Sequence, residues 1–138
     1  MQGIPGGGKT HLAEQIVHAT NAFYCSTDEF RFTDDVYVYD PETNKKFHSM
    51  CQEACLIAMV RGDETIVVDN TFIMRWQAAV YVVMAKEFGY EVQIVRVQCD
   101  IETAIKRQLL RSEDRRVPEY VIRDFAARME DLSPLLAR

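Results

Sequence analysis

Residues 3–10 of the chain are Gly-Ile-Pro-Gly-Gly-Gly-Lys-Thr, and this stretch fits the Walker A pattern G-x-x-x-x-G-K-[ST] at every position. Glycines let the backbone turn tightly enough to point successive N–H groups at phosphate oxygens, where a Cβ would obstruct the approach. Lys9 supplies a flexible charge for the β- and γ-phosphates, and the Thr10 hydroxyl can ligate Mg²⁺. The stretch predicts a nucleotide-phosphate site made of Gly3, Pro5, Gly6, Gly7, Gly8, Lys9 and Thr10. The alternative is a glycine-rich turn that binds nothing.

The composition indicates one folded domain covering residues 1–138, with 48% hydrophobic and 27% charged residues. We expect a cytoplasmic protein, because the sequence has no apolar run of membrane-spanning length and no signal-peptide pattern. Four cysteines without paired spacing favour buried thiols in a reducing compartment. The net charge of −5 disfavours indiscriminate nucleic-acid binding and leaves a local basic patch possible.

The start of the chain is unusual for this motif, because only Met1 and Gln2 precede Gly3. A Walker A loop normally follows a buried parallel strand, which fixes the loop at the carboxyl edge of the sheet. We therefore expect that the first strand is missing and that the printed sequence is truncated before Gly3. We also expect the tail, residues 133–138, to fray.

The rest of the chain alternates strands and helices. Apolar periodicity predicts helices over residues 9–20, 42–61, 73–88 and 101–111 and from Pro118 onward, and strands over 22–25, 65–69 and 92–97. Residues 32–41 mix acids with valines and tyrosines and are predicted to be a loop with some extended character. This alternation is typical of an α/β fold of the P-loop NTPase type, a three-layer sandwich with helices on both faces of a mainly parallel sheet.

Asp69 ends the most apolar predicted strand, Ile-Val-Val-Asp at residues 66–69. An apolar strand that delivers a carboxylate beside the phosphate loop is the Walker B arrangement. We expect Asp69 to act in the active site, as a metal ligand or on the substrate side. The alternative is an acid that caps the next helix, and the sequence leaves open whether Asp69 meets Mg²⁺ through water or holds an arginine.

Asp28 follows the strand at 22–25, at the edge where ligands bind in such sheets. Transfer of a phosphoryl group to an alcohol needs a carboxylate near the reacting hydroxyl, and Asp28 is placed for that role. Arg31 would share its face of a helical turn. The alternative is that Asp28 is a helix N-cap, since Ser, Thr and Asp are all good caps.

Arg107 and Arg111 are one helical turn apart in the predicted helix and would face the same way. Residues 106–116 carry five basic residues against two acids. Guanidinium groups neutralise the charge on a transferring phosphoryl group, which is the task of a kinase lid. The alternative is a solvated helix face, which suits Arg115 and Arg116 best.

Taken together, these motifs resemble the polynucleotide-kinase branch of the P-loop kinases, including the kinase domain of phage polynucleotide kinase and related eukaryotic kinase-like domains. The likeness runs from Gly3 to about Leu132. It depends on the Walker A loop, on Ser-Thr-Asp-Glu-Phe-Arg at 26–31, on Val-Val-Asp-Asn-Thr at 67–71, and on Lys106-Arg107 with Arg111 and the Val-Pro pair at 117–118.

The resemblance implies that Lys9 and Thr10 bind ATP and Mg²⁺ and that Asp28 is the general base toward a 5′-hydroxyl. It further implies that Arg31 holds the acceptor's phosphate and that Arg111, with Arg107, stabilises the transferring group. In related folds the missing strand lies between the strands at 65–69 and 92–97, so a gap or upstream residues should appear there.

The prediction is a kinase that transfers the γ-phosphate of Mg·ATP to a hydroxyl, most simply the 5′ end of a polynucleotide. One rival is a P-loop kinase acting on a nucleoside, sugar nucleotide or antibiotic. Another is a non-catalytic ATP-binding or interaction module. The oligomeric state is not predicted.

Overall fold

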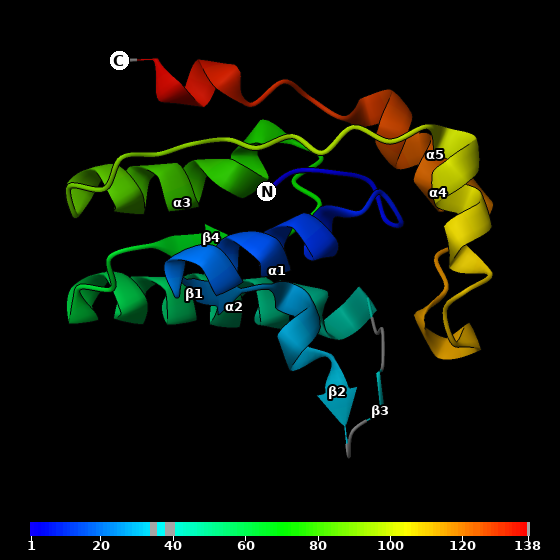
Figure 1. Cartoon of the computed structure of the whole chain (residues 1–138), viewed down its shortest axis with the longest axis horizontal. Helices are drawn as coiled ribbons and strands as arrows, with labels where there is room; N and C mark the ends of the chain where they lie inside the picture. Colours follow the sequence, from blue (N-terminus) through cyan, green and yellow to red (C-terminus); the bar gives the residue numbers. More distant parts are fainter. Residues whose placement is uncertain (34–35, 38–40, 138) are drawn as a thin grey trace.

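A pair of short parallel strands lies between the helices of this molecule (Figure 1). In this computed structural model, which describes residues 1–33, 36–37 and 41–137, strand β1 (Phe23–Cys25) pairs with β4 (Ile66–Val68). The register places Tyr24 opposite Val67. The predicted strands at 22–25 and 65–69 are therefore confirmed, each slightly shorter than expected.

Five α-helices are found in the described part of the chain: α1 (Lys9–Thr20), α2 (Pro41–Arg61), α3 (Arg75–Glu87), α4 (Ile101–Gln108) and α5 (Glu119–Arg128). Short 3₁₀ turns form η1 (Thr27–Phe30), η2 (Glu113–Arg115) and η3 (Ser133–Leu136). None of the described helices is both long enough and apolar enough to cross a membrane. The helix predicted over 9–20 matches α1 at both ends, where Gly8 and Asn21 take left-handed conformations.

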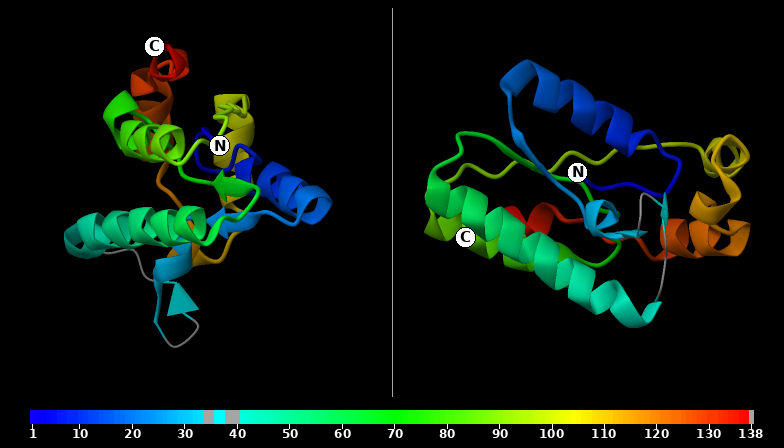
Figure 2. Two further views of the ribbon diagram at one scale, coloured as in Figure 1. Left: turned by 90° about the vertical axis from the view of Figure 1, so that its left-hand side faces the viewer. Right: turned by 90° about the horizontal axis from the view of Figure 1, so that it is seen from below.

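The helices form two layers around the strand pair. Figure 2 shows α1 on the opposite side of β1 and β4 from α2 and α3. The main core lies on the α2 and α3 side, where Cys25, Cys51 and Tyr81 are among the buried residues. Since side chains alternate along a strand, Phe23 and Cys25 face this core, and Tyr24 faces α1. The α/β fold with a parallel sheet thus follows the prediction.

The predicted strand at 92–97 is wrong over most of its length, because the described chain there forms a single parallel bridge, Gln2 to Arg96. A strand needs a hydrogen-bonded neighbour, and residues 93–95 instead line, together with residues 64–68, a cavity of about 470 Å³. Val92 and Ile94 still pack against the main core. The segment therefore contributes side chains to the core, although its backbone forms only one β-bridge.

The first three residues lie between β4 and the segment at 92–97, where the resemblance places upstream residues or a gap. The Met1 amine donates to the Val68 carbonyl oxygen at 2.8 Å, and the Gln2 N–H donates to the Val95 carbonyl oxygen at 2.8 Å. The Gln2 side chain is 1% exposed and donates to the carbonyl oxygens of Phe72 and Glu130, at 2.9 Å each. Gln2, which immediately precedes the phosphate loop in the chain, therefore connects segments that are distant in the sequence.

A second, smaller core joins α4 and α5 at one end of the molecule, around Ile4, Ala104 and Ile122 (Figure 1). Near the C-terminal end, residues 133–136 form η3, and Leu135 packs on the main core. The loop predicted at 32–41 contains a small antiparallel pair, β2 (Phe32–Thr33) with β3 (Val36–Tyr37). Residues 34–35 and 38–40 of this loop lie outside the described part.

Candidate active site

The predicted phosphate loop forms one continuous turn that leads into α1. Gly6 and Gly8 have φ angles of 81° and 88°, a region that side-chain-bearing residues rarely adopt. A Cβ on Gly6 would also lie 2.6 Å from the carbonyl oxygen of Ala104 in α4. The Gly7 N–H donates to the Ile4 carbonyl oxygen at 3.0 Å, and Lys9 is the first residue of α1. Glycine is thus required for the shape of the loop and for its contact with α4.

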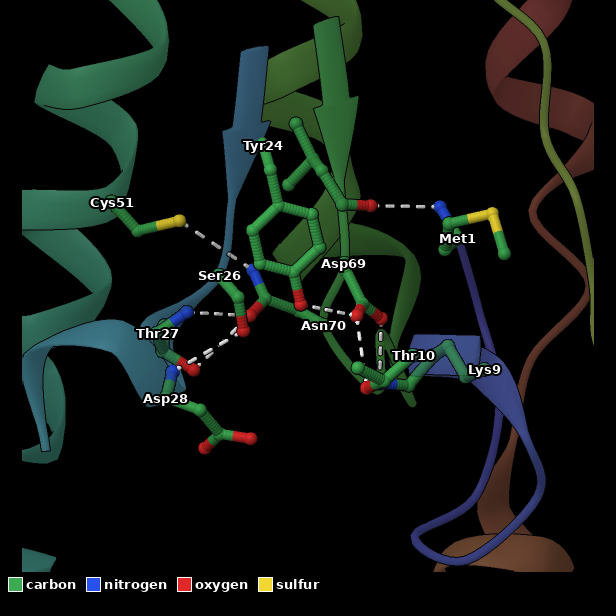
Figure 3. Close-up of polar contacts among 11 residues, drawn as sticks. Met1, Lys9, Thr10, Tyr24, Ser26, Thr27, Asp28, Cys51, Asp69 and Asn70 are labelled. Carbon is green, nitrogen blue, oxygen red and sulfur yellow. Dashed lines mark hydrogen bonds and ion pairs between the residues drawn. The ribbon is translucent and has the colours of Figure 1, made fainter. Parts of the chain in front are cut away.

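Asp69, just beyond the end of β4, accepts hydrogen bonds from three side chains of two elements, α1 and β1 (Figure 3). Lys9 Nζ lies 2.7 Å from Asp69 Oδ1, and Thr10 Oγ1 donates to Oδ2 at 3.1 Å. The carboxylate is buried, with its side chain 1% exposed. Burial by itself raises the pKa of Asp69, but the attraction of Lys9 and the hydrogen bonds hold that pKa below its usual value. The sequence left open an arginine partner or a helix cap for Asp69; the described contacts are instead with Lys9, Thr10 and Tyr24.

The chemistry of this donor set fits a magnesium ion. A threonine hydroxyl and a carboxylate are hard oxygen donors, which Mg²⁺ prefers, and both are present at Thr10 and Asp69. The two oxygens are within hydrogen-bond distance of each other, so a cation placed there would replace a contact that already holds them together.

Tyr24 is a functional candidate that the sequence reasoning missed. Tyr24 lies in β1, and its hydroxyl donates to Asp69 Oδ2, beyond the end of the neighbouring strand β4, at 2.5 Å. Burial and the neighbouring carboxylate both raise the pKa of Tyr24, so it remains a donor at neutral pH. The alternation of buried residues in β1 was the available signal: Tyr24 faces the phosphate loop because Phe23 and Cys25 face the core.

Asn70 is a second residue that the sequence reasoning did not place in the site. Its side-chain oxygen accepts hydrogen bonds from the Thr27 N–H at 3.0 Å and the Thr27 hydroxyl at 3.1 Å. Its side-chain nitrogen lies 3.8 Å from Cys51 Sγ. A polar residue directly after a strand-end acid, in an otherwise apolar segment, was the signal for it. Asn70 therefore fixes the turn that carries Asp28.

Asp28 lies in η1, but Ser26 is the N-cap of this turn and accepts from the Asp28 N–H at 3.3 Å. The N-cap alternative for Asp28 is thus wrong. Figure 3 shows the Asp28 side chain at the same edge of the sheet as Asp69 and the phosphate loop. The side chain of Asp28 is 59% exposed, whereas that of Arg31 is 5% exposed. A solvent-facing carboxylate in this position can accept a proton from a bound molecule.

Arg31 forms an ion pair with Asp28. Its Nε lies 3.4 Å from Asp28 Oδ1, so the predicted pairing on one face of a turn is present. The guanidinium group also donates to the Asn44 side-chain oxygen and lies 5.5 Å from the centre of the Phe47 ring, both in α2. These contacts fix the position of Arg31 from two elements.

The two predicted arginines of α4 are separated by the structure. Arg107 donates from Nη1 to the Gly6 carbonyl oxygen at 3.1 Å, so it lies over the phosphate loop. Arg111 does not share its helix face, because α4 ends at Gln108 rather than at residue 111. The Gln108 side chain accepts from the Val117 N–H at 3.0 Å, and residues 109–111 follow as tight turns with Arg111 exposed.

Comparison with known proteins identifies the family. The family model of the AAA domain (AAA_33) matches residues 1–132. The chain belongs to this AAA domain family. It is also 26% identical over 93 residues to the human NEDD4-binding protein 2, and this match covers 67% of the chain and 5% of that much longer protein.

A solved gluconokinase from Sinorhizobium meliloti 1021 has the same fold as this AAA domain. The TM-score is 0.61 at 14% identity, and the likeness covers 94% of this chain and 73% of the gluconokinase. The predicted P-loop NTPase-type fold is confirmed, and it is the fold of P-loop kinases. At this edge of the sheet, the AAA domain presents a glycine-rich loop, a lysine, two carboxylates and two arginines.

Proposed function

We propose that this AAA domain is an ATP-dependent kinase that transfers the γ-phosphate to a hydroxyl acceptor, and that the acceptor is the 5′-hydroxyl of a polynucleotide. One observation carries the proposal. The ends of the paired strands β1 and β4 bring together a phosphate-binding set, Lys9 with Asp69, and an acceptor-side set, Asp28 with Arg31. A phosphoryl transfer enzyme needs both sets, and a nucleotide-binding module needs only the first.

The donor side would hold Mg·ATP. Gly3, Pro5, Gly6, Gly7 and Gly8 present backbone to the phosphates, and Lys9 leaves Asp69 to meet their charge. Thr10 and Asp69 would hold the Mg²⁺, which neutralises phosphate charge when it is bound.

The acceptor side would activate the hydroxyl. Asp28 accepts the hydroxyl proton while the acceptor oxygen bonds to the γ-phosphorus and the bond to ADP breaks. Arg107, above the loop, would neutralise the charge that develops on the transferring group. Arg111 is a partner of Arg107 only if α4 lengthens by about one turn, since it now lies beyond the helix end.

The acceptor's identity has weaker support than the transfer reaction. Arg31 lies beside Asp28, where the phosphate next to a 5′-hydroxyl would bind, and this favours a polynucleotide. Because Arg31 is nearly buried, it would exchange part of its contact with Asp28 or Asn44 for that phosphate. The gluconokinase neighbour favours the rival, a small hydroxylated acceptor.

The test is transfer from γ-labelled ATP to a 5′-hydroxyl oligonucleotide, with gluconate and nucleosides as parallel acceptors. We expect labelled oligonucleotide with the unaltered chain and a loss of at least about 100-fold in rate with Asp28→Asn. The matched control is Glu29→Gln, which removes the adjacent exposed acid and should retain transfer.

Two other results would change the proposal. Labelling of gluconate or a nucleoside, without labelling of the oligonucleotide, replaces the acceptor but keeps the kinase. If folded protein binds Mg·ATP and labels none of these acceptors, the kinase proposal is abandoned in favour of a nucleotide-binding module.

A further inference from the structure

Tyr24 differs from the other two donors to Asp69, Lys9 and Thr10, because it lies in a strand and not at the phosphate loop. Tyr24 and Thr10 both donate to Oδ2, whereas Lys9 alone lies on Oδ1. The contact bridges two strands, because Tyr24 lies opposite Val67 in the parallel register and Asp69 lies two residues beyond Val67 on the same face. Figure 3 shows the phenol ring crossing this face toward the carboxylate.

The three donors differ in what nucleotide binding does to them. Under the proposed function, Lys9 turns to the phosphates and Thr10 turns its oxygen toward Mg²⁺. A carboxylate that is 1% exposed would then lose two partners at once. Tyr24 belongs to β1 rather than to the phosphate loop, so its hydrogen bond can persist.

We propose that Tyr24 is a positioning residue for Asp69: its hydrogen bond keeps Oδ2 beside Thr10, where the two residues would hold Mg²⁺, when Lys9 turns to the phosphates. The proposal rests on the proposed function only in that Asp69 serves Mg²⁺. It concerns the hydroxyl and not the ring: Tyr24 is half-buried beside a cavity of about 430 Å³ lined also by Thr10, Glu14, Val17 and His18. Phenylalanine therefore fits the same place, and Tyr24→Phe removes the hydrogen bond alone.

The experiment measures ATP binding by the full chain as a function of Mg²⁺ concentration, without an acceptor. We expect Tyr24→Phe to raise the Mg²⁺ concentration at half-saturation about tenfold, the effect of losing one hydrogen bond to a charged group. Binding of ATP in the presence of a chelator should stay unchanged. In an Asp69→Asn background, Tyr24→Phe should have no further effect, because the carboxylate that it positions is absent.

Tyr90→Phe is the matched control, because the Tyr90 hydroxyl also makes one partly buried hydrogen bond, to the Asp63 carbonyl oxygen at 2.5 Å, between the segments that follow α3 and α2. It should lower stability and leave the Mg²⁺ dependence unchanged. If Tyr24→Phe and the unaltered chain show the same Mg²⁺ dependence, or if chelated binding weakens equally, the positioning role is refuted. A chain that binds no ATP at any Mg²⁺ concentration refutes the proposed function itself, so the two failures are distinguishable.

Discussion

Replacing Lys9 by methionine should destabilise the protein even without any ligand, because Lys9 neutralises a buried carboxylate. Lys9 Nζ and Asp69 Oδ1 are 2.7 Å apart, and their side chains are 13% and 1% exposed. At an effective dielectric constant of about 20, two charges at this separation attract by roughly 6 kcal/mol, most of which offsets their desolvation. Breaking a buried pair costs about 3–5 kcal/mol. Since Tyr24 and Thr10 still donate to Asp69 in the variant, we expect a loss of about 3 kcal/mol.

Urea unfolding and thermal melting would measure this loss, and about 3 kcal/mol corresponds to roughly 10 °C in Tm for a chain of this size. Adding Asp69→Asn to Lys9→Met should recover part of the stability, because the unpaired charge is removed. Lys106→Met, on the exposed side of α4, is the control and should change stability by less than about 0.5 kcal/mol. If Lys9→Met is as stable as the unaltered chain, the ion pair contributes nothing and the low pKa of Asp69 has another cause.

Further predictions concern Asn70, the titration of Asp69, and Gly6. Asn70→Ala should cost about 2–4 kcal/mol in urea unfolding, since it leaves the buried N–H and hydroxyl of Thr27 without their acceptor. The pKa of Asp69 is lower in the folded than in the unfolded chain, so its contribution to stability is complete above about pH 4 and is lost as the pH falls further. Comparing urea midpoints at pH 7 and pH 3, Asp69→Asn should therefore lose less stability on acidification. Gly6→Ala should lower Tm more than Gly62→Ala, because both have positive φ but only Gly6 has α4 within contact distance of the new methyl group.

The sequence predicts those features that depend on neighbouring residues. The Walker A residues and the apolar spacing that follows them specify both ends of α1, and short apolar runs locate β1 and β4. The strand at 92–97 was predicted from equally apolar residues and is wrong, because a strand also requires a paired neighbour, and a cavity lies there. The end of α4 was likewise missed, because the Gln108 side chain bonds to Val117 in a later segment.

In the candidate site, too, features that depend on neighbouring residues were predicted, and features that depend on distant contacts were not. Lys9, Thr10 and Asp69 are brought together as expected, since a Walker A loop and a strand-end acid meet at one edge of a parallel sheet. Tyr24 and its partner Asp69 are 45 residues apart in the sequence, and Asn70 and its partner Thr27 are 43 residues apart. Both pairings depend on the register between two strands. Register is a tertiary property, so residue type alone did not identify them.

Asp69 and Asn70 are consecutive, yet one side chain contacts the phosphate loop and the other contacts the turn that carries Asp28. Because neighbouring residues of an extended chain point to opposite faces, this single peptide sets the spacing of both halves of the site. An insertion or deletion of one residue within β4 would exchange the carboxylate and the amide between the two faces. The loop between α2 and β4 can therefore vary in length, whereas the strand itself cannot, and any redesign of the turn that carries Asp28 must keep the two faces in this order.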